Sequence, residues 1–165
     1  MYILPVIDKT KLFAIGIKKK KKFEFVSEET LSEIEMLKWL KTKIQNENEF
    51  IVYKLTDIEN LFAVGIKYKI DLTLIGKNPI YLFDSLYRVA SLYRIFHEPP
   101  SPYMLSKFIG YKRAEKLVKQ YSALFDAKGE ILKNELKELL DAFGYIYTEL
   151  KNYILLGMKL LEKYK

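Results

Sequence analysis

A gapless internal repeat runs through the first half of the 165-residue sequence. At an offset of 49 residues, the string LFAIGIK at positions 12–18 recurs as LFAVGIK at positions 61–67. Across residues 2–40 and 51–89, 9 of 39 positions are identical, and most of the others keep their polarity. Neither copy is long enough to bury its own apolar face, so the repeat predicts one supersecondary unit that is used twice.

Each copy begins with the pattern of a short strand that leads into a polar turn. The strands are predicted at residues 2–7 and 51–55, and four-residue turns open with Asp8 and Asp57. An aspartate at the first position of a turn can accept hydrogen bonds from backbone N–H groups two residues further on. Both aspartates are therefore interpreted as turn residues rather than as catalytic groups.

After the turn, apolar residues alternate without a break through 12–26 and again through 61–75. Such alternation is typical of a strand with one buried face. After a two-residue hairpin, the residues that face the same side of the sheet would change from odd to even positions or the reverse. The apolar residues here keep to one set of alternate positions, so a two-residue hairpin does not fit them. Two alternatives remain: a loop of three or five residues near 19–21 and Tyr68, or one long bent strand in each copy.

A helix is predicted to close each copy. In the first copy, Thr30 and Glu33 have the spacing of a capping box, and an apolar stripe follows them. In the second copy, Asn78 is a favourable cap residue, and Pro79 suits the first position of a helix.

The expected fold class is α+β, with two regions. Residues 1–97 are predicted to form a duplicated β-β(-β)-α unit, with repeats at about 2–45 and 51–96, whose antiparallel sheet is covered by two helices. A cluster of prolines follows, and prolines prevent a helix from continuing. Residues 98–165 are predicted to be a helical C-terminal region.

This C-terminal region is predicted to contain helices at 103–108 and 111–124, a turn at 126–129, and one or two long helices from Glu130. Apolar spacings of four and three residues define a seam on the last helix. The seam packs either within the chain's own bundle or against another copy or a protein partner. As an oligomerisation surface, it would consist of Ile146, Leu150, Tyr153, Gly157 and Leu160.

Composition excludes several kinds of chemistry and favours one kind of partner. The sequence has no Cys and one His, which removes disulfides, thiolate metal sites and histidine-rich metal sites. It has no phosphate-binding glycine loop or nucleophile elbow, so no catalytic residue, metal or cofactor is assigned. The formal charge is +7, from 25 Lys and 3 Arg against 21 Asp and Glu, and a basic surface attracts polyanions such as nucleic acid.

Two further expectations concern the origin and location of the protein. Abundant Lys and Glu without Cys indicate a thermophile, although an AT-rich genome biases composition in the same direction. The N-terminal apolar run is short, and the C-terminal apolar stretch is interrupted by charges, so neither a signal peptide nor a membrane span is predicted. An intracellular, cytoplasmic protein is expected.

Lysines cluster at the centre of each predicted alternating stretch. Consecutive lysines beside strand aromatics can neutralise phosphates while a ring offers a stacking face. The alternatives are a solvated loop, or a sheet edge that lysines protect from aggregation. The candidate nucleic-acid-binding residues are Lys18, Lys19, Lys20, Lys21 and Lys22 in the first copy, and Lys67, Tyr68 and Lys69 in the second.

A third basic cluster surrounds Gly110. Two helices that turn there, with cations opening the second helix, would place amide groups and positive charge where a phosphate could bind. Over fewer than about 20 residues, this segment resembles a helix-hairpin-helix or a helix-turn-helix, which implies DNA binding. It departs from the first motif at Phe108, where a glycine is usual, and from the second at Lys116, where an apolar residue is expected. The alternative is a helical corner in a bundle. The candidate residues are Lys107, Lys112, Arg113, Lys116 and Lys119.

Together these features predict a non-enzymatic nucleic-acid-binding protein, for DNA or RNA, whose lysines contact the phosphate backbone. The alternative is a non-catalytic structural or scaffold subunit of a multi-protein or viral assembly, which binds through its C-terminal helices. An enzyme that uses Lys, Asp and Tyr would need a pocket where several such residues converge, and the sequence points to none.

Overall fold

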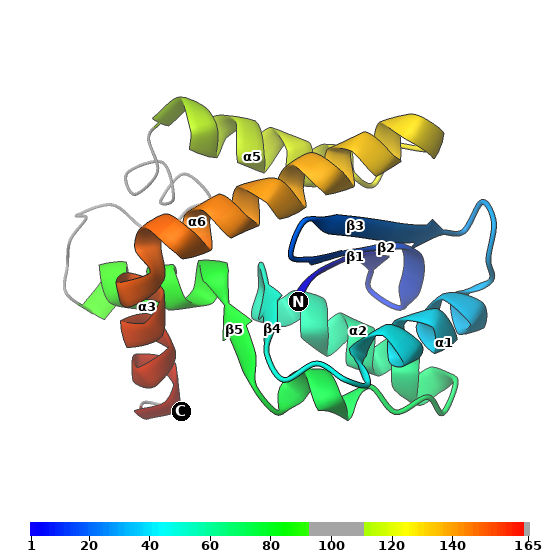
Figure 1. Ribbon diagram of the computed structural model, residues 1–165, viewed down its shortest axis with the longest axis horizontal. Coiled ribbons are helices and arrows are strands. Elements are labelled where there is room, and N and C mark those ends of the chain that lie inside the picture. The colour runs from blue at the N-terminus through cyan, green and yellow to red at the C-terminus, as the bar shows by residue number, and fades with distance from the viewer. Residues whose placement is uncertain (93–110, 164–165) are drawn as a thin grey trace.

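Figure 1 shows the computed structural model, which describes residues 1–92 and 111–163. The fold is α+β, as predicted, with a five-stranded sheet followed by a helical C-terminal region. In chain order, the elements of the described residues are β1 (Tyr2–Asp8), β2 (Lys11–Lys19), β3 (Lys22–Ser27), α1 (Glu33–Ile44), β4 (Phe50–Val52), α2 (Leu55–Lys67), the 3₁₀-helix η1 (Thr73–Gly76), β5 (Pro79–Tyr81), α3 (Leu82–Leu92), α5 (Tyr111–Ala123) and α6 (Gly129–Lys163).

The sheet is mixed rather than antiparallel. Its strand order is β3-β2-β1-β4-β5. The first three strands pair antiparallel, whereas β4 is parallel to β1 and β5 is parallel to β4. The expected antiparallel pairing therefore holds for the first copy only. Parallel strands require crossover connections, and α1 and α2 provide them.

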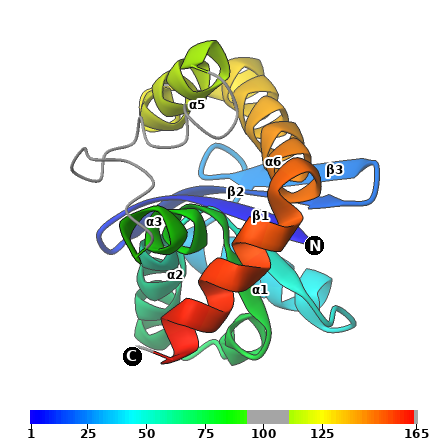
Figure 2. The ribbon, with the colours of Figure 1, turned by 90° about the vertical axis from the view of Figure 1, so that its left-hand side faces the viewer.

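Helices cover both faces of the sheet (Figures 1 and 2). On one face, α1 and α2 pack against β-strand residues that include Ile3, Ile15 and Ile17. On the other face, α6 packs over Leu4 and Ala14, and α5 lies against α6 (Figure 2). In a strand that is buried on both faces, apolar residues occur at odd and even positions alike.

The helix α6 has two neighbours. Its first half lies over the sheet, the backbone departs from helical geometry at Leu150 (φ −114°, ψ 19°), and the second half packs against α3 (Figure 1). The crossing with α3 is close at Gly157, where a Cβ atom would lie 2.1 Å from the carbonyl oxygen of Ser85. A residue without a side chain is therefore required at that crossing.

The repeated string does not form the same structure twice. In the first copy it is strand β2, as predicted, but in the second copy it lies in helix α2, and the predicted strand at 61–75 is wrong. The buried positions of α2 include Ile58, Leu61 and Val64, which have helical spacing. Ile66, which strand alternation would bury, is 77% exposed. The duplicated unit is therefore not confirmed as a structural repeat.

The connection between β2 and β3 is a two-residue hairpin, which is neither of the predicted alternatives. Lys19 pairs with Lys22, and two lysines form the turn between them. The parity switches as the hairpin rule requires: Ile17 faces α1 and α2, whereas Phe25 faces α6. Because both faces of this sheet are covered, apolar residues continue through 12–26 although the side that they face changes at the turn.

The start of α1 also differs from the prediction. Ser32, rather than Thr30, is the N-cap, and its capping-box partner is Glu35. Glu33 is thereby left available for contacts outside the helix.

In the second copy, Pro79 begins β5, and α3 starts at Leu82 instead of following Asn78. Asp57 opens no turn but lies in the first turn of α2.

The predictions for the C-terminal region are confirmed where the structure describes it. The helix expected at 111–124 is α5, and the turn predicted at 126–129 lies slightly earlier, at 124–126, so that a helix of 35 residues already begins at Gly129. Gly129 has a φ of +60°, which glycine adopts without a steric penalty. The helix predicted at 103–108 and the boundary near 97 lie outside the described residues.

Candidate nucleic-acid interface

The lysines of the first copy gather at the tip of the β2–β3 hairpin, and ion pairs hold several of them. Lys18 lies 2.6 Å from the Asp141 carboxylate on α6, and Lys19 pairs with Glu47. Lys22 lies 3.7 Å from the carboxylate of Glu24 on its own strand, and its side chain stays 74% exposed.

The remaining two lysines of the run, Lys20 and Lys21, form the turn and are exposed. The tip defined by Lys20, Lys21 and Lys22 is therefore the part of the predicted cluster that keeps accessible positive charge.

Lysine also occupies turn positions where glycine would be less strained. Among the described residues, the non-glycine residues with positive φ are Lys9, Lys20 and Lys69, at 54°, 55° and 56°. A left-handed backbone costs an L-residue with a side chain roughly 1–2 kcal/mol. Lys20 stands at the first central position of a two-residue hairpin, where glycine is common.

Lys69 follows α2 at a position where glycine is also common. The Lys69 N–H donates to Ile66 O, and the Ile70 N–H donates to Gly65 O, which is the Schellman pattern at a helix end.

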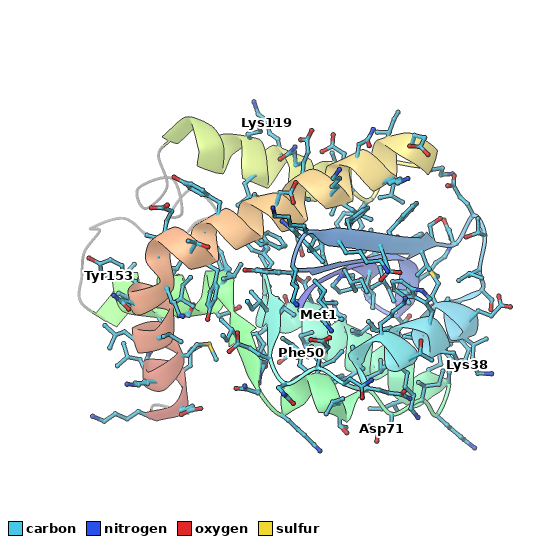
Figure 3. The ribbon with its side chains drawn as sticks, in the orientation of Figure 1. Met1, Lys38, Phe50, Asp71, Lys119 and Tyr153 are labelled. Atoms are coloured by element: carbon cyan, nitrogen blue, oxygen red, sulfur yellow. The ribbon has the colours of Figure 1, made fainter. Side chains whose placement is uncertain are left out.

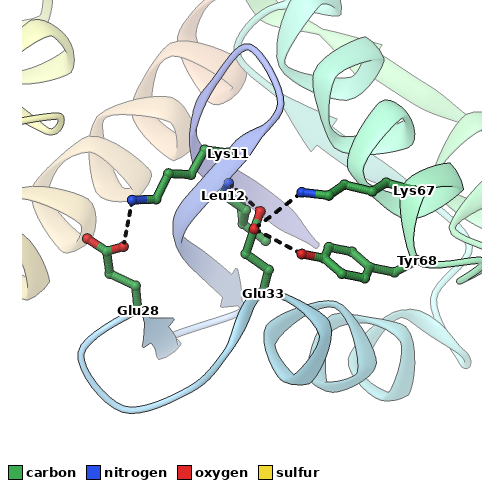
Figure 4. A network of polar contacts seen from close by, with 6 residues as sticks. All are labelled: Lys11, Leu12, Glu28, Glu33, Lys67 and Tyr68. Carbon is green, nitrogen blue, oxygen red and sulfur yellow. Dashed lines mark hydrogen bonds and ion pairs between the residues drawn. The ribbon is translucent and has the colours of Figure 1, made fainter.

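Lys67 and Tyr68 of the second copy contact the Glu33 carboxylate at the other end of β2 (Figure 4). Glu33 accepts hydrogen bonds of 3.0 Å from the Leu12 N–H and from the Tyr68 hydroxyl, and Lys67 Nζ lies 3.7 Å away. Burial opposes ionisation, but these bonds and the lysine charge outweigh it and lower the pKa of Glu33. Lys67 and Tyr68 therefore help to join α2, β2 and α1.

The structure does not bring the two predicted lysine groups together. Strand β2 runs from Lys11, next to the Glu33 network, to Lys19, next to the hairpin tip. At about 3.3 Å per residue, its ends are about 26 Å apart. One continuous binding surface made by both copies is therefore not formed.

The basic residues of the third cluster fall on α5 where they are described. Lys116 is 70% exposed and lies 3.7 Å from the Glu138 carboxylate on α6. Lys119 is exposed, and Figure 3 shows it on the outer side of α5. Lys112 and Arg113 belong to the backbone of α5, without described side chains, and Lys107 lies outside the described residues.

The predicted oligomerisation seam is largely covered within the chain. Ile146, Leu150, Gly157 and Leu160 are buried, mostly against the sheet and α3. Tyr153 differs, because half of its surface is exposed (Figure 3).

A buried polar cluster was missed in the sequence. Asp57 is 5% exposed, and its Oδ1 accepts a 2.7 Å hydrogen bond from the Tyr121 hydroxyl of α5, whereas its Oδ2 is buried without a partner. Burial raises the pKa of Asp57 to about 6, although the hydrogen bond from Tyr121 and the nearby Lys54 act in the opposite direction. Burial also raises the pKa of Tyr121. The repeat aligns Asp57 with Asp8, an exposed residue, and therefore predicts a turn residue at 57 rather than a buried one.

Aromatic rings surround the side-chain ammonium group of Lys54, the residue that precedes α2. Lys54 Nζ lies 5.1 Å from the ring centroids of Phe83 and Tyr121 and 5.6 Å from that of Tyr53. Such cation–π contacts stabilise a partly buried cation by about 1–2 kcal/mol. Together with the Asp57 hydrogen bond, they attach α5 to the start of α2.

Within residues 1–92 and 111–163, no three His, Asp or Glu side chains gather where they could hold a metal ion. None of the helices in that part of the chain combines the length and the apolar character that are needed to cross a bilayer. Comparison of the chain with protein-family models, curated proteins and solved structures finds no match.

Proposed function

We propose that this protein binds nucleic acid, without catalysis, through phosphate contacts made by the β2–β3 hairpin tip. The observation that carries the proposal is the presence of lysine at a strained turn position, Lys20, with lysines on both sides. The hairpin needs a positive φ at this position but not a lysine, and a non-glycine residue held there is a reason to look for a function in its side chain. Here the side chain is a cation at the outermost point of a hairpin.

The charge of the whole chain supports the same conclusion. A formal charge of +7 attracts a polyanion over a long range, and an exposed tip of three lysines can follow one phosphate strand. Each neutralised phosphate releases counterions, so affinity should fall steeply as salt concentration rises. These contacts carry little sequence information, and binding is therefore expected to depend weakly on base sequence.

Removal of the tip charges tests the proposal. The variant K20S/K21S/K22S is expected to lose at least about tenfold in affinity for a labelled oligonucleotide at low salt. The slope of log affinity against log salt concentration should become shallower by about 2–3, because three phosphate contacts are lost. Fluorescence anisotropy at several salt concentrations measures both quantities.

The matched control removes three exposed lysines from the opposite layer, in K38S/K41S/K77S. This variant has the same net charge as the first, so it should bind almost as the wild type does. Equal losses in both variants would mean that net charge, not the tip, is responsible. A wild type without salt-sensitive affinity for DNA or RNA would overturn the proposal.

A second candidate function is the scaffold subunit, and one observation favours it. The second half of α6 exposes Tyr153, Leu155 and Leu156, with exposed fractions of 50%, 38% and 37%. Neighbouring exposed apolar side chains are typical of contact surfaces. Light scattering separates the two candidates: stable association without nucleic-acid affinity supports a scaffold, and a monomer with salt-sensitive affinity supports the first proposal.

A further inference from the structure

A groove lies between α5 and α6, on the side of α6 that contacts the hairpin. Its volume is about 340 Å³. Apolar side chains line much of it, and Tyr145 is 43% exposed. The lining residues are Lys116, Leu117, Gln120, Glu138, Asp141, Ala142, Tyr145 and Ile146.

The charges in this groove are balanced. The Glu138 carboxylate accepts a hydrogen bond from the Gln120 amide and lies 3.7 Å from Lys116 Nζ. Asp141 on the other side is paired with Lys18 at 2.6 Å. A phosphate inside the groove would meet two carboxylates, so the groove suits a neutral group with polar edges. Positive charge lies at its rim, where the exposed Lys116 side chain is paired with Glu138, and along the hairpin.

We propose that this groove binds an unpaired nucleobase, an inference that rests on the proposed nucleic-acid binding. The ring of Tyr145 provides a stacking face, which any base can use. The carboxylates of Glu138 and Asp141 can accept hydrogen bonds from the exocyclic amino groups of cytosine or adenine. A base inside a duplex cannot enter, because it is stacked and its pairing edge is occupied.

The geometry also relates the groove to the phosphate site. Lys18 belongs to the strand that leads into the hairpin tip, and its partner Asp141 lines the groove. A single strand whose base enters the groove can therefore continue along the tip lysines. The protein should prefer single-stranded to double-stranded nucleic acid, and oligo-dC or oligo-dA to oligo-dT.

The test compares single-stranded and duplex oligonucleotides of equal length, with wild type and two variants of Tyr145. Tyr145→Ala is expected to weaken single-strand binding by about 5- to 150-fold and to leave duplex binding unchanged. Tyr145→Phe keeps the stacking face and should bind like the wild type. Tyr153→Ala, which removes another half-exposed tyrosine from α6, is the matched control and should also bind like the wild type.

The outcomes separate this inference from the proposed function. If single strands and duplexes bind equally and Tyr145→Ala has no effect, the groove inference fails, while salt-sensitive binding through the tip can still hold. Tighter binding of oligo-dT than of oligo-dC and oligo-dA would overturn the role of the two carboxylates. If the wild type binds neither kind of oligonucleotide, both proposals fail.

Discussion

Asp57 lies inside the protein, with one carboxylate oxygen bonded to Tyr121 and the other without a partner. Burial raises its pKa from 3.8 to about 6, so the folded protein holds this proton more tightly than the unfolded chain. The stability that protonation contributes is therefore complete below pH 3.8 and is lost as the pH rises through about 6. The full difference is at most about 3 kcal/mol.

We expect Asp57→Asn, which keeps an acceptor for Tyr121 but cannot ionise, to be more stable than the wild type by about 1–3 kcal/mol above pH 6. The difference should shrink towards pH 4. Chemical denaturation between pH 4 and 8 measures the free energy of unfolding of both proteins.

The exposed Asp71 provides a control, because its pKa is shifted in the opposite direction from that of Asp57. A side-chain hydrogen bond and then a backbone hydrogen bond from Thr73 lower its pKa, so Asp71→Asn should be destabilising at neutral pH. A stability difference between Asp57→Asn and the wild type that does not vary with pH would contradict the role given to Asp57.

The strained lysine at the hairpin tip leads to a second prediction. Lys20→Gly should raise the free energy of unfolding by about 0.5–1 kcal/mol, because glycine adopts the left-handed backbone without a steric penalty. The same substitution should weaken nucleic-acid binding.

Lys21→Gly is the control, because Lys21 lies in the same turn without a positive φ. It should weaken binding and give no gain in stability. Denaturant melts together with anisotropy titrations measure both effects. Lower stability in Lys20→Gly would mean that the turn is not strained.

At the scale of elements, the repeated string shows what the sequence alone could determine. Alternation correctly predicted β2, but the same residues in α2 also satisfy helical spacing, since Leu61, Val64 and Gly65 share one buried face. Contacts decide between the two periods: β2 lies between two strands, whereas α2 packs on the sheet face. The helices α5 and α6 were predictable because their apolar spacings fit no strand.

Two glycines of α6 give a prediction about how this helix packs. Gly157→Ala should lower the free energy of unfolding by about 2–4 kcal/mol, because its Cβ would lie 2.1 Å from the backbone oxygen of Ser85 and the helices would have to separate. Gly144→Ala is the control: its nearest neighbours would be 3.9 Å away, so helix propensity should raise stability by about 0.5–1 kcal/mol.

Thermal and denaturant unfolding of the two variants test this packing. Similar effects in both would contradict the close crossing of α3 and α6.

For the whole molecule, the sequence predicts which segments of the candidate site are basic, but not where these segments lie relative to one another. The lysine-rich strings were evident in the sequence, but the partners of Lys18 and Lys19 come from positions 141 and 47 and depend on the tertiary fold. The same holds for the groove, whose two walls meet only because α5 folds back along α6. The buried contact of Asp57 with Tyr121 joins residues 64 positions apart, and no local pattern indicates it.

The position of α6 in the chain has a consequence for biosynthesis. Leu4 and Ala14 are made well before α6, the helix that covers them and the last of the described elements. A nascent chain therefore carries an uncovered apolar sheet face until α6 has been made. Exposed surfaces of this kind attract chaperones and promote aggregation. Translation speed between the codons for the sheet and those for α6 should consequently influence the yield of native protein.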